Sequence, residues 1–177
     1  MTKESTGIRK LVSAALCLAI AMVLPFLTGQ IPEVGQALCP MHIPVLLCGF
    51  VCGWPWGLAV GFLSPLLRYL LFGMPPIYPV GVAMAFELAA YGLFTGILYR
   101  HLPQKVSSIY LTLILSMILG RVVWGIVQFV LAGLTGGTFP FSAFLAGAVT
   151  TAIPGIVVHI LLIPLLVMAL RKAKLIL

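Results

Sequence analysis

Three ionisable side chains lie deep inside long apolar stretches of the sequence: Arg68, Glu87 and Arg121. A charge at the centre of a membrane helix costs at least about 2.5–3.5 kcal/mol, so such residues face the interior of a bundle and find partners there. Two interpretations of Glu87 are open, a structural ion pair with Arg121 or a polar ligand site reached from outside. Two arginines against one glutamate leave one positive charge unmatched. An anionic ligand group would complete the set, unless Arg68 extends outward to the membrane surface.

The neighbours of these charges suit the recognition of a small organic molecule. Tyr91 follows Glu87 by one helical turn and shares its face, and Trp124 and Gln128 share a face with Arg121 in the same way. A carboxylate, a guanidinium, an amide and two amphipathic aromatic rings can stack a flat ring and hydrogen-bond its edge. The spacing leaves open whether the two faces meet.

Other reactive residue types predict less. Cys39, Cys48 and Cys52 lie near His42 and include "CPMH", half of a metal-like spacing, but a second half is missing, so we interpret them as apolar filler. We interpret His159 as a satisfied core histidine rather than a ligand or coupling residue. The sequence has no nucleophile–base pair, P-loop or dinucleotide turn, so we expect no enzymatic activity, no cofactor and no bound metal.

Composition identifies the setting of these residues. Of 177 residues, 62% are hydrophobic and 7% are charged, whereas a soluble domain is nearer half apolar and a quarter charged. The long, repeated apolar runs indicate an integral membrane protein with one transmembrane domain over residues 1–177. The net charge of +7 comes from basic residues at segment ends, which indicates contact with the lipid bilayer and not with nucleic acid.

Six transmembrane helices in a compact all-α bundle fit the apolar runs best. We expect them at about 8–28, 41–53, 57–73, 79–99, 108–132 and 142–170. The segment 40–73 is the weak point, because "GWPWG" divides it into two spans that are short for a hydrocarbon core of about 30 Å. One long bent helix there would give five spans.

The positions of the basic residues favour six spans. Basic clusters precede the first span, separate the fourth from the fifth and follow the last: Lys3, Arg9, Lys10; Arg100, Lys105; Arg171, Lys172, Lys174. With six spans all three clusters fall on one side, and the loops 29–40, 74–78 and 133–141 on the other side contain no Lys or Arg. This is the positive-inside pattern with both termini cytoplasmic. Five spans would place the basic C-terminus outside.

Small residues recur every fourth position, for example Gly92 and Gly96 in the fourth span and Ala15 and Ala19 in the first. Such stripes let helix backbones approach closely in lipid. They serve either packing within the bundle or contact with another membrane subunit, and the first span is the best candidate for such a contact.

The sequence resembles the substrate-binding S components of energy-coupling factor (ECF) transporters, which import vitamins and related micronutrients in prokaryotes. Six short spans with both ends inside and the pair Ala15-x-x-x-Ala19 carry part of the resemblance. The most family-like part is "HIPVLLCGFVCGWPWGLAVGFLSPLLRYLLFG", in which a Pro-containing entry precedes "G-x-x-x-G-W-x-x-G-x-x-x-G". The resemblance covers essentially the whole length. It implies a multi-pass protein of a prokaryotic plasma membrane.

The resemblance also implies a binding site and partners. Substrate would bind from outside between the outer halves of the fourth to sixth spans, under a lid formed by the loop after the first span. The pocket maps to Glu87, Tyr91, Trp124, Gln128 and Arg121, to which we add Arg68 for its unmatched charge. The lid maps to residues 30–38, with Gln30, Glu33 and Gln36. The implied partners are a membrane scaffold T component and two cytoplasmic ATPase subunits, docked through Ala15 and Ala19.

The sequence does not name the ligand. A flat nitrogen heterocycle of the queuine or pyridoxine type would use Glu87 and Trp124, and we favour it slightly over pantothenate or another carboxylate vitamin, which would use the spare arginine. Two rival classes are a stand-alone facilitator or structural membrane subunit, and an intramembrane enzyme, for which no reactive constellation is found.

Overall fold

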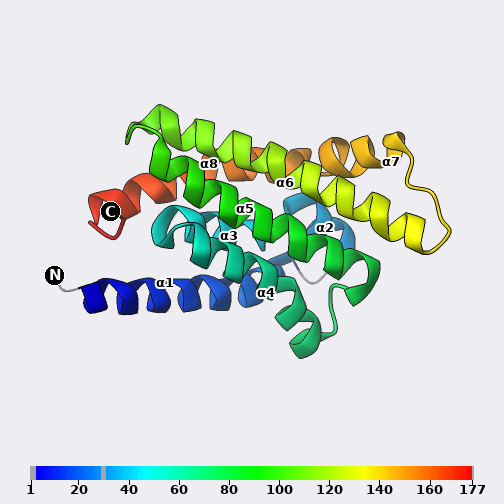
Figure 1. Cartoon of the computed structure of the whole chain (residues 1–177), viewed down its shortest axis with the longest axis horizontal. Helices are drawn as coiled ribbons and strands as arrows, with labels where there is room; N and C mark the ends of the chain where they lie inside the picture. The colour runs from blue at the N-terminus through cyan, green and yellow to red at the C-terminus, as the bar shows by residue number, and fades with distance from the viewer. Residues whose placement is uncertain (1–2, 29–30, 177) are drawn as a thin grey trace.

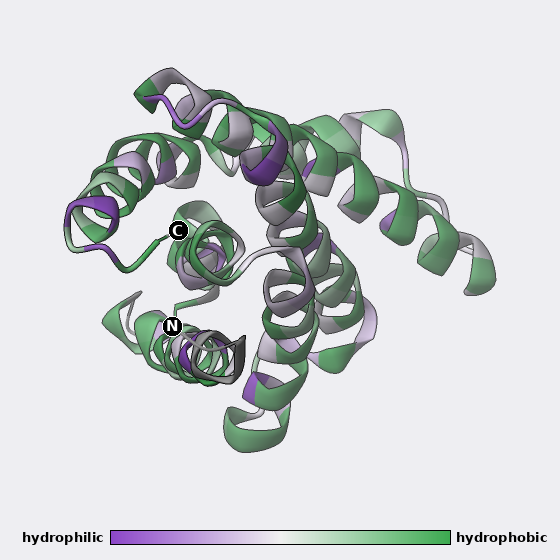
Figure 2. Ribbon diagram, turned by 60° about the vertical axis from the view of Figure 1, so that its left-hand side comes forward, coloured by the Kyte–Doolittle hydropathy of each residue, from purple (hydrophilic) through white to green (hydrophobic). Residues whose placement is uncertain are grey.

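Helices make up nearly all of the described chain, residues 3–28 and 31–176 of a computed structural model (Figure 1). Five helices are long: α1 (Lys3–Val23), α4 (Trp54–Phe72), α5 (Val82–His101), α6 (Val106–Leu134) and α8 (Ile153–Lys172). The shorter elements are η1 (Leu24–Thr28), α2 (Pro32–Leu38), α3 (His42–Cys52), η2 (Ile77–Gly81), α7 (Phe141–Leu145) and η3 (Ala146–Thr150). Figure 2 shows hydrophobic residues along the whole length of the helices, as contact with lipid requires.

Within the described residues, five helices are long and apolar enough to cross a membrane. The predicted span 41–53 corresponds to α3, which has 11 residues and is therefore only about 16 Å long. Most of α3 is buried among the other helices. The six-span count therefore stays a prediction, with α3 as the short pass. In Figure 1, α1 begins and α8 ends at the same end of the bundle, where α5 also connects to α6.

The predicted division at "GWPWG" is confirmed. Gly53 ends α3 with φ of 89° and ψ of 177°, a backbone conformation that residues with a Cβ rarely adopt. Pro55 then lies in the first turn of α4, where its missing N–H leaves no helical hydrogen bond broken. The chain therefore turns sharply and enters a new helix.

The prediction of one helix over 142–170 is wrong, because the structure divides this segment. It contains α7, the wider η3, a turn at residues 151–152, and then α8. Pro154 lies in the first turn of α8, and proline cannot donate a hydrogen bond back to the preceding turn. The break moves α7 toward α6, where the ring of Phe144 stacks on that of Trp124 at a centroid distance of 6.2 Å.

Glycines bring α4 and α5 into backbone contact. A Cβ at Gly92 would overlap the carbonyl oxygen of Gly57, and one at Gly61 would overlap that of Leu88. These small-residue stripes therefore serve packing within the bundle. The stripe of α1 differs, because Ala15 and Ala19 are exposed.

We expect Gly92→Ala to lower the stability of the protein by about 1–3 kcal/mol, as overpacking of a close contact typically does. The added methyl group has no space beside the backbone of Gly57. Gly133→Ala in α6 is the matched control, since a Cβ there would have no atom within 4 Å. Melting curves in detergent measure both. An unchanged melting temperature for Gly92→Ala would contradict the close packing of α4 on α5.

The predicted topology is tested by cysteine-accessibility labelling in intact cells. In a background without the four native cysteines, single cysteines in the loops 74–78 and 133–141 should react with an impermeant reagent. A cysteine next to Lys105 should react only after the cells are opened. Labelling of that site from outside would refute the six-span topology with cytoplasmic termini.

Candidate functional site

A cavity of about 500 Å³ lies among the connection between α4 and α5, the segment around α2, and the helices α3 to α6 with η3. This volume is typical of small-molecule sites. Five residues that the sequence singled out line it: Arg68, Glu87, Arg121, Trp124 and Gln128. The two helix faces that spacing alone left apart therefore meet at one cavity.

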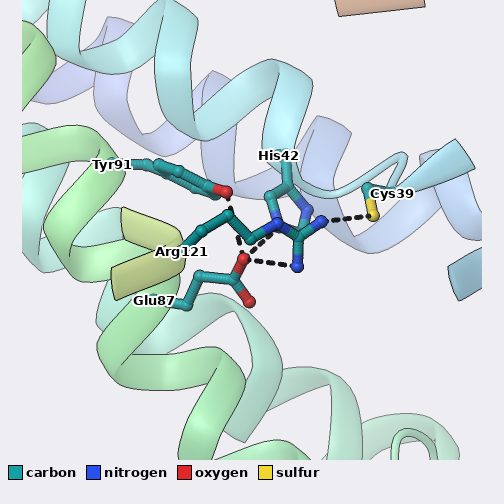
Figure 3. A network of polar contacts seen from close by, with 5 residues as sticks. All are labelled: Cys39, His42, Glu87, Tyr91 and Arg121. Carbon is teal, nitrogen blue, oxygen red and sulfur yellow. Dashed lines mark hydrogen bonds and ion pairs between the residues drawn. The ribbon is translucent and has the colours of Figure 1, made fainter. Parts of the chain in front are cut away.

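Glu87 is the centre of a polar network in this cavity (Figure 3). Its side chain is buried, with the residue 1% exposed. Oε1 lies 2.9 Å from Nη1 of Arg121 and accepts a hydrogen bond of 3.1 Å from the hydroxyl of Tyr91. Nε2 of His42 lies 3.5 Å from the same oxygen, within ion-pair distance. Oε2 carries no dashed line in Figure 3, and no partner for it is found in the described chain.

Arg121 connects Glu87 to other parts of the wall. Its Nη2 lies 3.6 Å from Sγ of Cys39, and its guanidinium carbon lies 6.0 Å from the ring centroid of Trp124. The Glu87–Arg121 pair is therefore both a tie between α5 and α6 and part of the cavity surface. The structural and the ligand-binding interpretations of Glu87 are compatible.

Tyr91 does not line the large cavity, although the sequence placed it in the pocket. Its ring packs so closely against α6 that a Cβ at Gly120 would overlap it, and its hydroxyl supports Glu87 from behind. Tyr91 instead lines a small second cavity with Cys39, His42 and Arg121. It therefore positions Glu87.

Arg68 is buried at the cavity wall, with the residue 3% exposed. Its Nη1 donates a hydrogen bond of 2.6 Å to the carbonyl oxygen of Met22. Its guanidinium carbon lies 5.0 Å from the ring centroid of Phe26 and 5.3 Å from that of Phe72. In the part of the chain that the structure describes, no carboxylate pairs with it.

The predicted lid contains the short helix α2, and Ile31 and Gly35 from this segment line the cavity. Gln30 lies outside the described residues, as does the side chain of Gln36, and Glu33 is exposed. The segment rests on α8, where a Cβ at Gly155 would lie 2.6 Å from the carbonyl oxygen of Ala37. The segment therefore forms part of the cavity wall, and its role as a lid stays a prediction.

His42 and Cys39 belong to the site and were missed as binding residues. The ring of His42, at the start of α3, lies 5.1 Å from that of Tyr91 and 6.0 Å from that of His159. A second cavity of about 10 Å³ lies between these residues, room for about one water molecule. "CPMH" was their signal in the sequence. In the described residues, no three His, Cys, Asp or Glu side chains are placed to hold a metal ion.

Apolar membrane-length helices surround a mostly apolar cavity with a few charged and polar side chains, an arrangement that suits a membrane protein that binds a small solute. A comparison with protein families identifies which kind: the family described as "ECF transporter, substrate-specific component" matches residues 9–167. The chain therefore belongs to this family, as the sequence predicted. A search of curated proteins found no match, and a search of solved structures found none either.

Family membership fixes several properties. Members are substrate-binding subunits without enzymatic activity, so the chain is not an enzyme. It is a multi-pass membrane protein of a prokaryotic transporter family. Membership implies partnership with an ECF module. The family match leaves the substrate undetermined.

Proposed function

We propose that this S component captures a vitamin or vitamin-like molecule from outside with high affinity. It releases the molecule inside after docking to a T component that carries two ATPase subunits. The observation that carries the proposal is the cavity of about 500 Å³ at which Glu87, Arg121, Trp124 and Gln128 meet. Each of these side chains offers a different kind of contact to one small molecule.

The chemistry of the wall favours a flat nitrogen heterocycle. Oε2 of Glu87 has no partner in the described chain and can accept a hydrogen bond from an N–H edge. Trp124 lines the same cavity and provides a ring face for stacking. Gln128 both donates and accepts. A deazapurine of the queuine type or a pyridoxine-like ring uses all three, and pantothenate or another carboxylate vitamin comes next.

The exposed small residues of α1 support the docking step. Ala15 and Ala19 are exposed, whereas Ala14 and Ala21 on the same helix are buried against the bundle. Two small residues one turn apart on an exposed helix surface let another membrane helix approach closely at that point. We assign this face to the T component.

The alternative is a stand-alone facilitator or a structural membrane subunit. A purely structural subunit has no use for a cavity of about 500 Å³ that is lined by a carboxylate, two guanidinium groups and an amide. A facilitator would move its solute without an ATPase, and transport assays with and without the module separate it from an S component.

The proposal is tested by ligand retention on the chain alone. The purified protein is incubated with a defined mixture of water-soluble vitamins and nitrogen heterocycles, washed, and examined by native mass spectrometry. We expect one compound to stay bound at one molecule per chain. Glu87→Gln should lose it while the protein stays folded. Retention of no compound by the wild-type chain would contradict the proposal.

A further inference from the structure

We propose that Arg68 forms an anion subsite, so that the captured molecule carries a carboxylate or phosphate group. This inference rests on the proposed function and narrows the class of substrate. It concerns a part of the cavity separate from the Glu87 network, since no contact between Arg68 and that network is found in the described residues.

The charges on the cavity wall do not balance. Glu87 and Arg121 neutralise each other at 2.9 Å, and His42 is shared with the same carboxylate oxygen. Arg68 lines the same cavity and adds a positive charge that no described carboxylate compensates. One carboxylate and two guanidinium groups therefore leave the described wall with one positive charge in excess.

The donors of Arg68 are only partly used by the protein. A guanidinium has five N–H donors in a planar fork, and the structure gives Nη1 one acceptor, the carbonyl oxygen of Met22. The neighbouring rings of Phe26 and Phe72 restrict the rotation of this long side chain. A restrained fork loses less entropy when it binds, and its geometry matches the two oxygens of a carboxylate or phosphate.

The loss of water from around Arg68 when a ligand binds indicates whether the ligand group next to it is an anion or neutral. In the empty cavity, water can hydrate the guanidinium. A ligand that displaces this water with an uncharged, apolar group leaves a buried charge without compensation, which is strongly unfavourable. A carboxylate or phosphate replaces the lost hydration with a charge-assisted hydrogen bond. This places an acid-bearing heterocycle or a carboxylate vitamin such as pantothenate ahead of queuine and pyridoxine, which carry no acid group, and so reverses the ranking that the Glu87 side of the cavity alone favours.

A purely structural role is the competing explanation. Arg68 holds the carbonyl of Met22 near the C-terminal end of α1, where a positive charge is favourable to the helix dipole. In that case, removing the guanidinium would lower the melting temperature of the empty protein and leave ligand retention unchanged.

The experiment starts from the compound retained by the wild-type chain out of the defined mixture, which contains matched acid and neutral pairs such as pantothenate with panthenol and nicotinate with nicotinamide. Affinity for that compound is measured by isothermal titration for wild type, Arg68→Gln and Arg68→Lys. Arg100→Gln, at the exposed end of α5, is the matched control. Melting curves of the empty proteins are recorded beside the titrations.

We expect the retained compound to be the acid of its pair and its neutral partner to bind at least about 30-fold more weakly, the lower end for breaking a buried charged contact. Arg68→Gln should lose a similar factor in affinity for the acid, Arg68→Lys should lose less, and Arg100→Gln should lose none.

If Arg68→Gln does not fold, two other measurements test the subsite: the ratio of wild-type affinities for the acid and its neutral partner, and the partial loss of affinity in Arg68→Lys. A retained neutral or cationic compound, or full affinity for the acid in both Arg68 variants, overturns the subsite and leaves the proposed function standing. Retention of no compound overturns both.

Discussion

Glu87→Gln is expected to weaken ligand binding by about 30-fold to several thousand-fold. The substitution keeps the shape of the side chain and removes its charge. Removing one partner of a buried, charged hydrogen bond typically costs roughly 2–5 kcal/mol of binding free energy, which corresponds to this range of affinity loss. Isothermal titration with the retained compound measures the loss. It should be far larger than any loss caused by Arg100→Gln at the exposed end of α5.

The same substitution should also lower stability, because it strands Arg121, whose Nη1 lies 2.9 Å from Glu87. Breaking a buried pair costs about 3–5 kcal/mol when one charge remains. A double-mutant cycle with Arg121→Gln separates the two effects. The double variant should regain part of the lost melting temperature and none of the lost affinity. Unchanged affinity in Glu87→Gln beside a depressed melting temperature would reduce Glu87 to a structural role.

The second large effect is expected on α1. Ala15→Trp with Ala19→Trp should abolish uptake in cells that carry the ECF module, while the purified variant still binds ligand with nearly wild-type affinity. Both residues are exposed and lie one turn apart, so two indole rings there prevent close approach of a partner helix. No described residue of α1 lines the cavity, which is why binding should persist.

Ile20→Trp is the matched control for this face. Ile20 is 40% exposed on the same helix, but it lies about a third of a turn away from the Ala15–Ala19 stripe, at roughly 100° per residue. This variant should transport normally. Normal uptake by the variant with both Ala15→Trp and Ala19→Trp would exclude this face as the docking surface. An equal loss of uptake in this variant and in Ile20→Trp would indicate general damage to α1.

The sequence predicted the Glu87–Arg121 pair only as one of two interpretations, because a charge in lipid needs a partner but helical spacing does not show whether the two faces meet. The break at Gly53 could be predicted, since a glycine before Trp-Pro both ends one helix and begins another. At Gly53 a single local rule dominates the outcome.

Other features depend on tertiary geometry that periodicity does not contain. Helical spacing places Tyr91 and Glu87 on one face, but it does not give the extent of the cavity, which Glu87 lines and Tyr91 does not. His42 joins the network because α3 brings its first residue against α5. The division of 142–170 had a local signal in Pro154, which the high hydropathy of the segment obscured.

We propose that the solute bound in this cavity is taken up only when an ATPase module drives transport. The most direct measurement is uptake of the labelled compound into cells that express the chain alone, the chain with the module, or Glu87→Gln with the module. Accumulation should occur only for the wild-type chain with the module, and a Walker-motif variant of the ATPases should stop it. Equal accumulation by the chain alone would contradict the account and identify a facilitator.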